Sequence, residues 1–211
     1  ALDSCGILVY LFFRLAGKPM ISLYHKVQKV ESLQKSVDKD TKVFKRHACI
    51  ECESFCAECC RYNDVTATSL EFLPFAWHAY KLGLLEQWLE DLEKNESQQC
   101  IFLRQDADKW GCKIYPVRGL ICRLFGFSAI TDKNGRPVYA ACRILKQHRP
   151  EIASRAGLYV VGGGKVPVIS TYYRRLASID PSTGNDFMPI NQAIKKALEI
   201  VYFHCLYRES A

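Results

Sequence analysis

The sequence predicts a helix-rich α+β fold in which helices and a few short strands pack around a cysteine cluster. Three observations support this class. Apolar residues recur at helical spacing over residues 20–46, 68–92 and 190–207. Between residues 100 and 127 the apolar runs are short and are interrupted by Asp, Gly and Pro, as in a hairpin or in short strands joined by loops. Five of the twelve residues from 49 to 60 are cysteines.

The second helical segment has recognisable boundaries. Thr68 and Glu71 have the spacing of a capping box, which predicts a helix that begins near Thr68. Pro74 is tolerated in its first turns. Gly83 predicts a break that divides the segment into two helices.

The last part of the chain contains a turn and a long helix. Residues 132–137, DKNGRP, are typical of a tight turn. The final helix is expected to run from about Ile190 to Tyr207. Cys205 lies on its apolar stripe, which favours a buried small side chain over a metal ligand.

Composition and charge narrow the class of protein. Because 49% of the 211 residues are hydrophobic, an ordered core can be buried. We expect one domain, made of an N-terminal segment (1–46), a cysteine-rich core (49–142) and a C-terminal helical extension (143–211). The net charge is +7, but the densest basic group, residues 42–47, is too short for a nucleic-acid arm. We therefore expect no nucleic-acid partner.

An apolar run near the amino end raises the question of a membrane anchor. Residues 5–13 are apolar, and Arg14 ends the run. A spanning helix needs roughly 20 apolar residues. We therefore expect a buried strand or helix here and no membrane partner. The cysteine spacing is typical of intracellular metal sites and predicts a cytoplasmic protein, which could bind another, unknown protein.

The cysteines favour metal thiolates over disulfides. The chain has eleven cysteines, an odd number, and its core needs no covalent staples. Cys59 and Cys60 are adjacent, and disulfide geometry does not easily join near neighbours. Spacings of two or three residues, as in Cys49-x2-Cys52 and Cys52-x3-Cys56, let thiolates turn back on one metal ion.

The count of cysteines fits two metal sites. Setting aside Cys5 and Cys205 leaves nine candidate ligands: Cys49, Cys52, Cys56, Cys59, Cys60, Cys100, Cys112, Cys122 and Cys142. Two four-thiolate sites would use eight of them, with one of Cys49 and Cys52 spare. Adjacent side chains in extended chain point to opposite faces, so Cys59 and Cys60 are predicted to serve different metals.

Other motifs are weaker. Residues 162–165, GGGK, could cradle an anion, but they lack the complete P-loop and GxGxxG spacings, so a plain turn is favoured. His47, His78 and His148 are more typical of ordinary surface or helix histidines. His47 is the best of the three as a ligand because it lies two residues before Cys49.

A set of ordered motifs resembles a known family. The motifs are CAECCR at 56–61, CIFL at 100–103, GCKIY at 111–115 and, after Arg118, CR at 122–123. They resemble the YkgJ-type cysteine-cluster family, whose members carry a CxxCxxCC box and are described as zinc- or iron-chelating proteins. The resemblance covers about residues 49–142 and implies metal binding without an agreed reaction.

The sequence departs from the family pattern at two positions. The family's first cysteine would fall at Glu53, so Cys52 or Cys49 is expected to take its place, with Cys52 the better choice. Gly119 stands where the family has proline, which is expected to loosen the turn before Cys122.

These observations predict an α-rich metalloprotein with one or two cysteine-ligated centres. Crowded cysteine runs suit multi-iron clusters, so a 4Fe-4S cluster is favoured over zinc, with a redox or electron-transfer role. Arg118 and Arg123 could hydrogen-bond the thiolates or balance their charge, or could pair with carboxylates. Two alternatives remain: a structural zinc protein that presents a partner-binding surface, and a metal-dependent modification enzyme. The related flagellin lysine methylases make methyl transfer conceivable for the latter.

Overall fold

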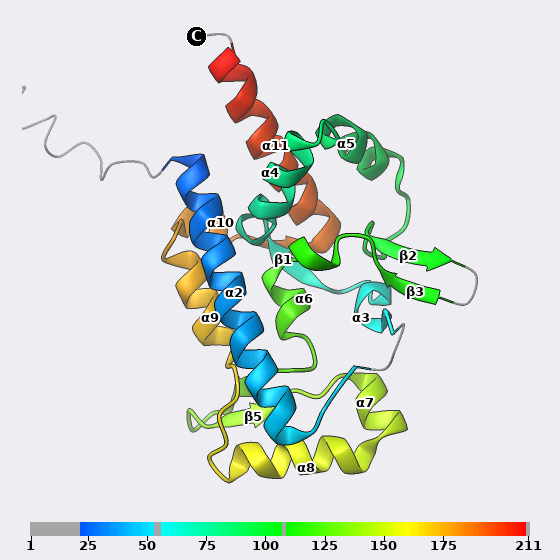
Figure 1. Ribbon diagram of the computed structural model, residues 1–211, viewed down its shortest axis with the longest axis vertical. Coiled ribbons are helices and arrows are strands. Elements are labelled where there is room, and N and C mark those ends of the chain that lie inside the picture. Colours follow the sequence, from blue (N-terminus) through cyan, green and yellow to red (C-terminus); the bar gives the residue numbers. More distant parts are fainter. Residues whose placement is uncertain (1–21, 53–55, 107–108, 210–211) are drawn as a thin grey trace, which may run out of the picture.

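The computed structural model describes residues 22–52, 56–106 and 109–209 (Figure 1). It confirms the predicted class: of the described residues, 61% are helical and 11% are in strands, which form three small antiparallel sheets of two strands each. The α-helices are α2 (Leu23–Ala48), α3 (Glu58–Arg61), α4 (Leu73–Lys81), α5 (Leu85–Lys94), α6 (Leu120–Leu124), α7 (Arg143–His148), α8 (Pro150–Val161), α9 (Ile169–Ala177), α10 (Pro181–Gly184) and α11 (Ile190–Glu209). The remaining elements are the 3-10 helices η1 (Ser69–Phe72) and η2 (Tyr115–Val117), and the strands β1 (Thr66–Thr68), β2 (Leu103–Asp106), β3 (Lys109–Cys112), β4 (Ala129–Thr131), β5 (Pro137–Tyr139) and β6 (Phe187–Pro189).

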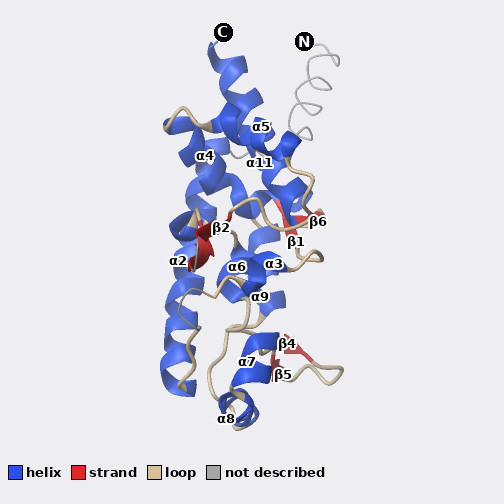
Figure 2. Cartoon of the chain, turned by 90° about the vertical axis from the view of Figure 1, so that its right-hand side faces the viewer, coloured by secondary structure: helices blue, strands red, loops and turns tan. Residues whose placement is uncertain are grey.

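Helix α2 runs along the long axis of the molecule (Figures 1 and 2). The Ser22 side chain accepts a hydrogen bond from the His25 amide and caps its first turn. Its buried residues recur every three or four positions: Leu23, Val27, Val30, Leu33, Gln34, Val37, Thr41, Phe44 and Ala48. The helix predicted from this periodicity is confirmed.

The predicted capping box is present. The Thr68 amide donates to the Glu71 carboxylate at 2.9 Å, but the box begins the 3-10 helix η1, which leads into α4. Pro74 lies in the first turn of α4. Gly83 has a φ of +67° and separates α4 from α5, as predicted, because glycine adopts left-handed backbone at little cost.

The strands form three separate pairs. Strands β2 and β3 form the hairpin predicted between residues 100 and 127, and β4 and β5 pair on either side of the predicted turn at 132–137. Strand β1 pairs with β6, more than a hundred residues later, with Ala67 opposite Met188. This long-range pair joins the middle of the chain to the start of α11.

The buried side chains form two clusters, and α2 contributes to both. In the larger cluster α11 packs against α4 and η1, and α4 packs against the first half of α2. The smaller cluster surrounds Phe44 near the end of α2 and includes Ile50, Leu145, Ala156 and Val160. Helices α7 and α8 cover this second cluster (Figure 1).

Two further expectations concern the apolar run near the amino end and the glycine-rich residues 162–165. The apolar run at 5–13 lies outside the described residues. Among the helices in the described ranges, none has the length and apolar character needed to span a bilayer. The glycine-rich residues 162–164 form the turn that ends α8, and Lys165 pairs with Asp40 at 3.5 Å.

Gly119, which stands where the family pattern has proline, lies in a tight contact just before α6. A Cβ atom at this position would lie 2.7 Å from the Phe72 ring and 2.9 Å from a Glu71 carboxylate oxygen. The backbone before α6 therefore rests directly on η1, and the glycine permits this close approach.

We predict that Gly119→Ala destabilises the fold by about 1–3 kcal/mol, because the added methyl overpacks a buried contact. Gly157→Ala is the matched control. Gly157 lies in α8 with nothing within 4 Å of its added Cβ, so alanine there should stabilise by up to about 1 kcal/mol. Urea unfolding of both variants measures the difference. Equal stability of the two proteins would contradict the close packing at Gly119.

Candidate metal centre

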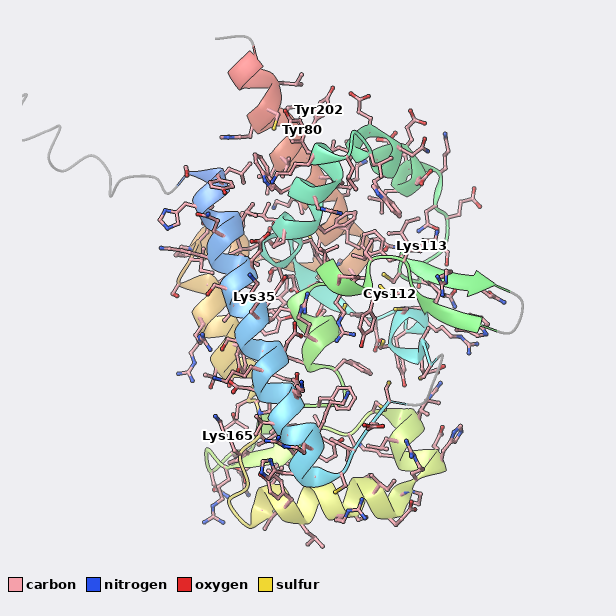
Figure 3. All side chains as sticks on the ribbon, in the orientation of Figure 1. Lys35, Tyr80, Cys112, Lys113, Lys165 and Tyr202 are labelled. Atoms are coloured by element: carbon pink, nitrogen blue, oxygen red, sulfur yellow. The ribbon has the colours of Figure 1, made fainter. Side chains whose placement is uncertain are left out.

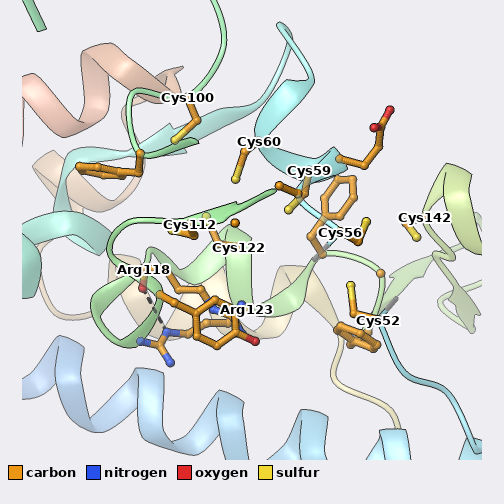
Figure 4. A pocket seen from close by; sticks show the side chains of 18 of the residues that line it. Cys52, Cys56, Cys59, Cys60, Cys100, Cys112, Arg118, Cys122, Arg123 and Cys142 are labelled. Atoms are coloured by element: carbon orange, nitrogen blue, oxygen red, sulfur yellow. Dashed lines mark hydrogen bonds between the residues drawn. The ribbon is translucent and has the colours of Figure 1, made fainter. Parts of the chain in front are cut away.

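Eight of the nine predicted ligands line one cavity of about 350 Å³ (Figure 4). The thiols come from the loop before α3, from α3 itself, from the segment before β2, from the end of β3, from α6 and from the start of α7. They are Cys52, Cys56, Cys59, Cys60, Cys100, Cys112, Cys122 and Cys142. Segments that are up to 90 residues apart in sequence therefore meet at one place.

One group of thiols surrounds Cys60. The Cys60 side chain hydrogen-bonds with those of Cys100 and Cys112, and the Cys100 amide donates to the Cys60 carbonyl at 3.1 Å. Burial raises the pKa of the Cys122 thiol, on α6, and the nearby charges of Cys100 and Cys112 raise it further. Phe72, Phe102, Ile114 and Ile190 form the apolar wall on this side.

A second group surrounds Cys52. Its thiol hydrogen-bonds with that of Cys56 and is influenced by the charges of Cys59 and Cys142. Cys142 is the N-cap of α7, where its sulfur accepts from the Leu145 amide at 3.4 Å. In Figure 4 the side chains of Cys52, Cys56 and Cys142 lie on one side of the cavity, away from Cys60 and Cys100.

The adjacent pair lies at the boundary between the groups. Cys59 and Cys60 are in α3, which is a short helix and not the extended chain assumed in the sequence argument. Consecutive helical side chains diverge by about 100°. Cys60 is buried and joins the first group, whereas Cys59 hydrogen-bonds with Cys60 and also faces Cys52.

Because the thiols are crowded, the pKa values of some are raised and those of others are lowered. Hydrogen bonds with its cysteine neighbours raise the pKa of Cys60. The hydrogen bond from Cys60 and, secondarily, the Ile114 amide and the Arg118 charge lower the pKa of Cys112 to about 7. Although Cys52 is exposed as a residue, removal of its thiol from water raises its pKa to about 11. Cys112 is thus among the thiols that ionise most easily.

The two arginines near the cavity have different roles. The guanidinium of Arg118 lies over the Tyr115 ring at 4.0 Å, and its charge helps to lower the pKa values of Cys59 and Cys112. Its Nε is buried and has no hydrogen-bond acceptor among the described residues. Arg123 instead pairs with Asp38 of α2.

Arg123 also organises the loop before α6. Its guanidinium donates to the carbonyl oxygens of Arg118 at 3.1 Å and of Pro116 at 2.7 Å. The side chain is only 6% exposed. Arg123 is therefore a structural residue that holds the loop of Arg118. Of the two roles considered from the sequence, it has the pairing with a carboxylate, that of Asp38.

Cys49, His47 and Cys205 do not line the thiol cavity. Cys49 ends α2 with a left-handed φ of +52°, is exposed and does not line the cavity. Its thiol donates to the Arg46 carbonyl at 3.7 Å. His47 stacks on Tyr159 and hydrogen-bonds the Val43 carbonyl. Cys205 is buried in the main core on α11.

Sequence reasoning missed the walls and the support of the cavity. The aromatic lining includes Phe125 and Phe127, which no spacing pattern indicates. Glu71 is recognisable only as a local cap, yet its carboxylate also accepts from the Ile121 amide at 2.8 Å and so holds the helix of Cys122. The capping box is the one signal that points to Glu71.

The thiols surround a cavity but do not yet form a closed coordination shell. Within the described ranges, no set of three or more histidine, cysteine or carboxylate side chains has the arrangement of a bound ion. Thiol ligands must deprotonate to bind a metal, and their binding is generally coupled to local folding.

We predict that Cys49→Ser keeps the full metal content of the protein and that Cys52→Ser lowers it. The reason is position, because Cys52 lines the thiol cavity and Cys49 does not. Metal and protein should be quantified in anaerobically purified samples of both variants. Equal loss from the two substitutions would show that nine thiols, and not eight, bind metal.

Comparisons with known proteins agree with this geometry. Residues 51–143 match the family model described as "CxxCxxCC: Putative zinc- or iron-chelating domain". Neither the curated proteins nor the solved structures gave a match. The matched segment contains all eight cysteines of the cavity. Residues 51–143 of this chain are therefore similar to the CxxCxxCC cysteine-cluster domains, in agreement with the resemblance of the sequence motifs.

Proposed function

We propose that the protein holds two four-thiolate centres and serves a redox or electron-transfer reaction. Cys60, Cys100, Cys112 and Cys122 would ligate one centre, and Cys52, Cys56, Cys59 and Cys142 the other. The observation that carries the proposal is the gathering of eight thiols, in two adjoining groups, around a single cavity.

The residues present fit iron–sulfur clusters. Thiolates are the ligands of such clusters, and crowded cysteine runs that serve two clusters are known from bacterial ferredoxins. The apolar wall limits access of water, and the Arg118 charge opposes the negative charge of the thiolates. A bound cluster would supply one-electron redox chemistry, whose potential depends on hydrogen bonds to sulfur and on burial.

The competing function is a structural zinc protein, because the same eight thiols could ligate two zinc ions. Anaerobic purification separates the two. Iron–sulfur clusters give brown protein with iron and acid-labile sulfide, and a redox change on addition of dithionite. Colourless protein with about two zinc ions per chain would overturn the redox proposal while leaving the thiolate sites intact.

We predict that Cys60→Ser removes one centre and spares the other, because Cys60 hydrogen-bonds with Cys100 and Cys112 of the first group and, in the second group, with its neighbour Cys59 alone. Metal content should therefore fall by half. Cys205→Ser is the control, since Cys205 is also buried but lies in the core on α11. A single metal centre per chain that Cys60→Ser leaves unaffected would contradict the assignment of Cys59 and Cys60 to different centres.

We predict that removal of the metal loosens the cysteine-rich region before α11. Thiolate sites in small zinc modules contribute on the order of 10 kcal/mol, and this energy is coupled to folding. Helix α11 instead packs against α4 and η1 through apolar contacts. Hydrogen exchange after chelation should accelerate in α3, α6 and the start of α7 and change little in α11. Unchanged exchange in α3 would mean that the metal is incidental to the fold.

A further inference from the structure

A second, wider cavity of about 940 Å³ adjoins the thiol cavity. It lies between the C-terminal half of α2, the loop after it, the η2 loop and the junction of α7 with α8. Six basic and two acidic side chains line it: Lys42, Lys45, Arg46, Arg118, Arg123, Arg149, Asp38 and Glu51. We refer to it as the basic groove.

Most of the positive charge in the groove is uncompensated. Asp38 is occupied by Arg123. Among the described residues, neither Lys42 nor Arg46 has a salt-bridge partner, and both are exposed. Only Glu51, which is exposed beside Arg149, remains as an opposing carboxylate.

Two guanidinium groups of the groove have unused donors. The Nε atoms of Arg118 and Arg149 are buried and have no acceptor within the described part of the chain. Arg149 also donates from Nη2 to the Glu51 carbonyl at 3.2 Å, and Arg118 is fixed against Tyr115. Both arginines are therefore held in place with a donor unsatisfied, and an oxyanion would supply the missing acceptor.

We propose that the basic groove binds a small-molecule polyanion through its phosphate or carboxylate groups. Guanidinium forks match these groups geometrically, and lysine ammonium groups add charge without fixed geometry. The cavity volume lies within the range of about 300–1,000 Å³ that small-molecule sites occupy. Six basic side chains around such a volume favour a ligand with several negative charges.

The groove shares a wall with the thiol cavity. Tyr115, Arg118 and Arg123 line both cavities. A bound anion would therefore lie beside the metal centre with Arg118 between them. The anion site itself is built from groove residues, so it does not depend on whether the thiols hold iron–sulfur clusters or zinc.

Isothermal titration of the purified, metal-loaded protein tests the proposal. Tripolyphosphate and citrate are the two probes. The probe that binds with the higher affinity identifies phosphate or carboxylate as the preferred group. Binding should weaken as ionic strength rises, because groove charges are partly exposed. The Lys42→Gln/Arg46→Gln protein should bind the preferred anion roughly tenfold or more weakly, since two charged contacts are removed.

A matched variant controls for net charge. Lys35 and Lys39 lie on α2 two helical turns before Lys42 and Arg46, with the same spacing, and do not line the groove (Figure 3 shows Lys35). Lys35→Gln/Lys39→Gln should keep the wild-type affinity. No binding of either probe, or equal weakening in both double variants, would overturn the proposal. Metal content measured in the same samples separates this outcome from failure of the metal sites.

Discussion

The buried carboxylate of Glu71 joins the segments on which the thiol cavity is built. It is fully buried and accepts from the Thr68 amide, the Ile121 amide at 2.8 Å and the Tyr173 hydroxyl at 3.2 Å. Removal from water raises its pKa, and these hydrogen bonds act in the opposite direction by favouring the charged form. One side chain thus ties η1, α6 and α9 together, and α6 carries Cys122.

The contacts that begin at Glu71 continue to the metal-binding surface. Helix α6 also carries Arg123, which reaches Asp38 on α2 and two carbonyl oxygens of the η2 loop. That loop presents Arg118 to the thiols. Cys142, by contrast, packs against the smaller apolar cluster around Phe44. The thiol cavity therefore lies where the two cores meet, and metal bound there would connect them. This placement explains many thiols in a chain that has ample apolar core.

Local patterns in the sequence located several of the helices, the hairpin and a turn, but not the partners of these elements. Periodicity located α2 and α11, because a helix buries one face at a fixed repeat. The capping box at Thr68 and the break at Gly83 depend on neighbours a few residues away. The pairing of β1 with β6, the bond from Ile121 to Glu71 and the close approach at Gly119 join distant segments. Such contacts arise from packing, which no local pattern records. The cysteine count indicated two groups, but only the fold assigns Cys100 and Cys142 to different sides of the cavity.

The two cavities favour opposite charges: ionised thiols are negative, and the side chains of the basic groove are mostly positive. Arg118 lines both cavities. Thiolates that bind metal carry negative charge, and the cations of the basic groove repel one another in the absence of an anion. The thiol cavity offers Arg118 a counter-charge, because the Arg118 charge favours the ionised thiols of Cys59 and Cys112. The groove offers no net counter-charge by itself, and the Arg118 Nε has no acceptor among the described residues. Binding of an anion in the groove would draw on the same guanidinium that stabilises the thiolates. Because linkage is reciprocal, the charge state of the thiol cavity and the affinity of the groove for an anion must then influence each other by the same free energy.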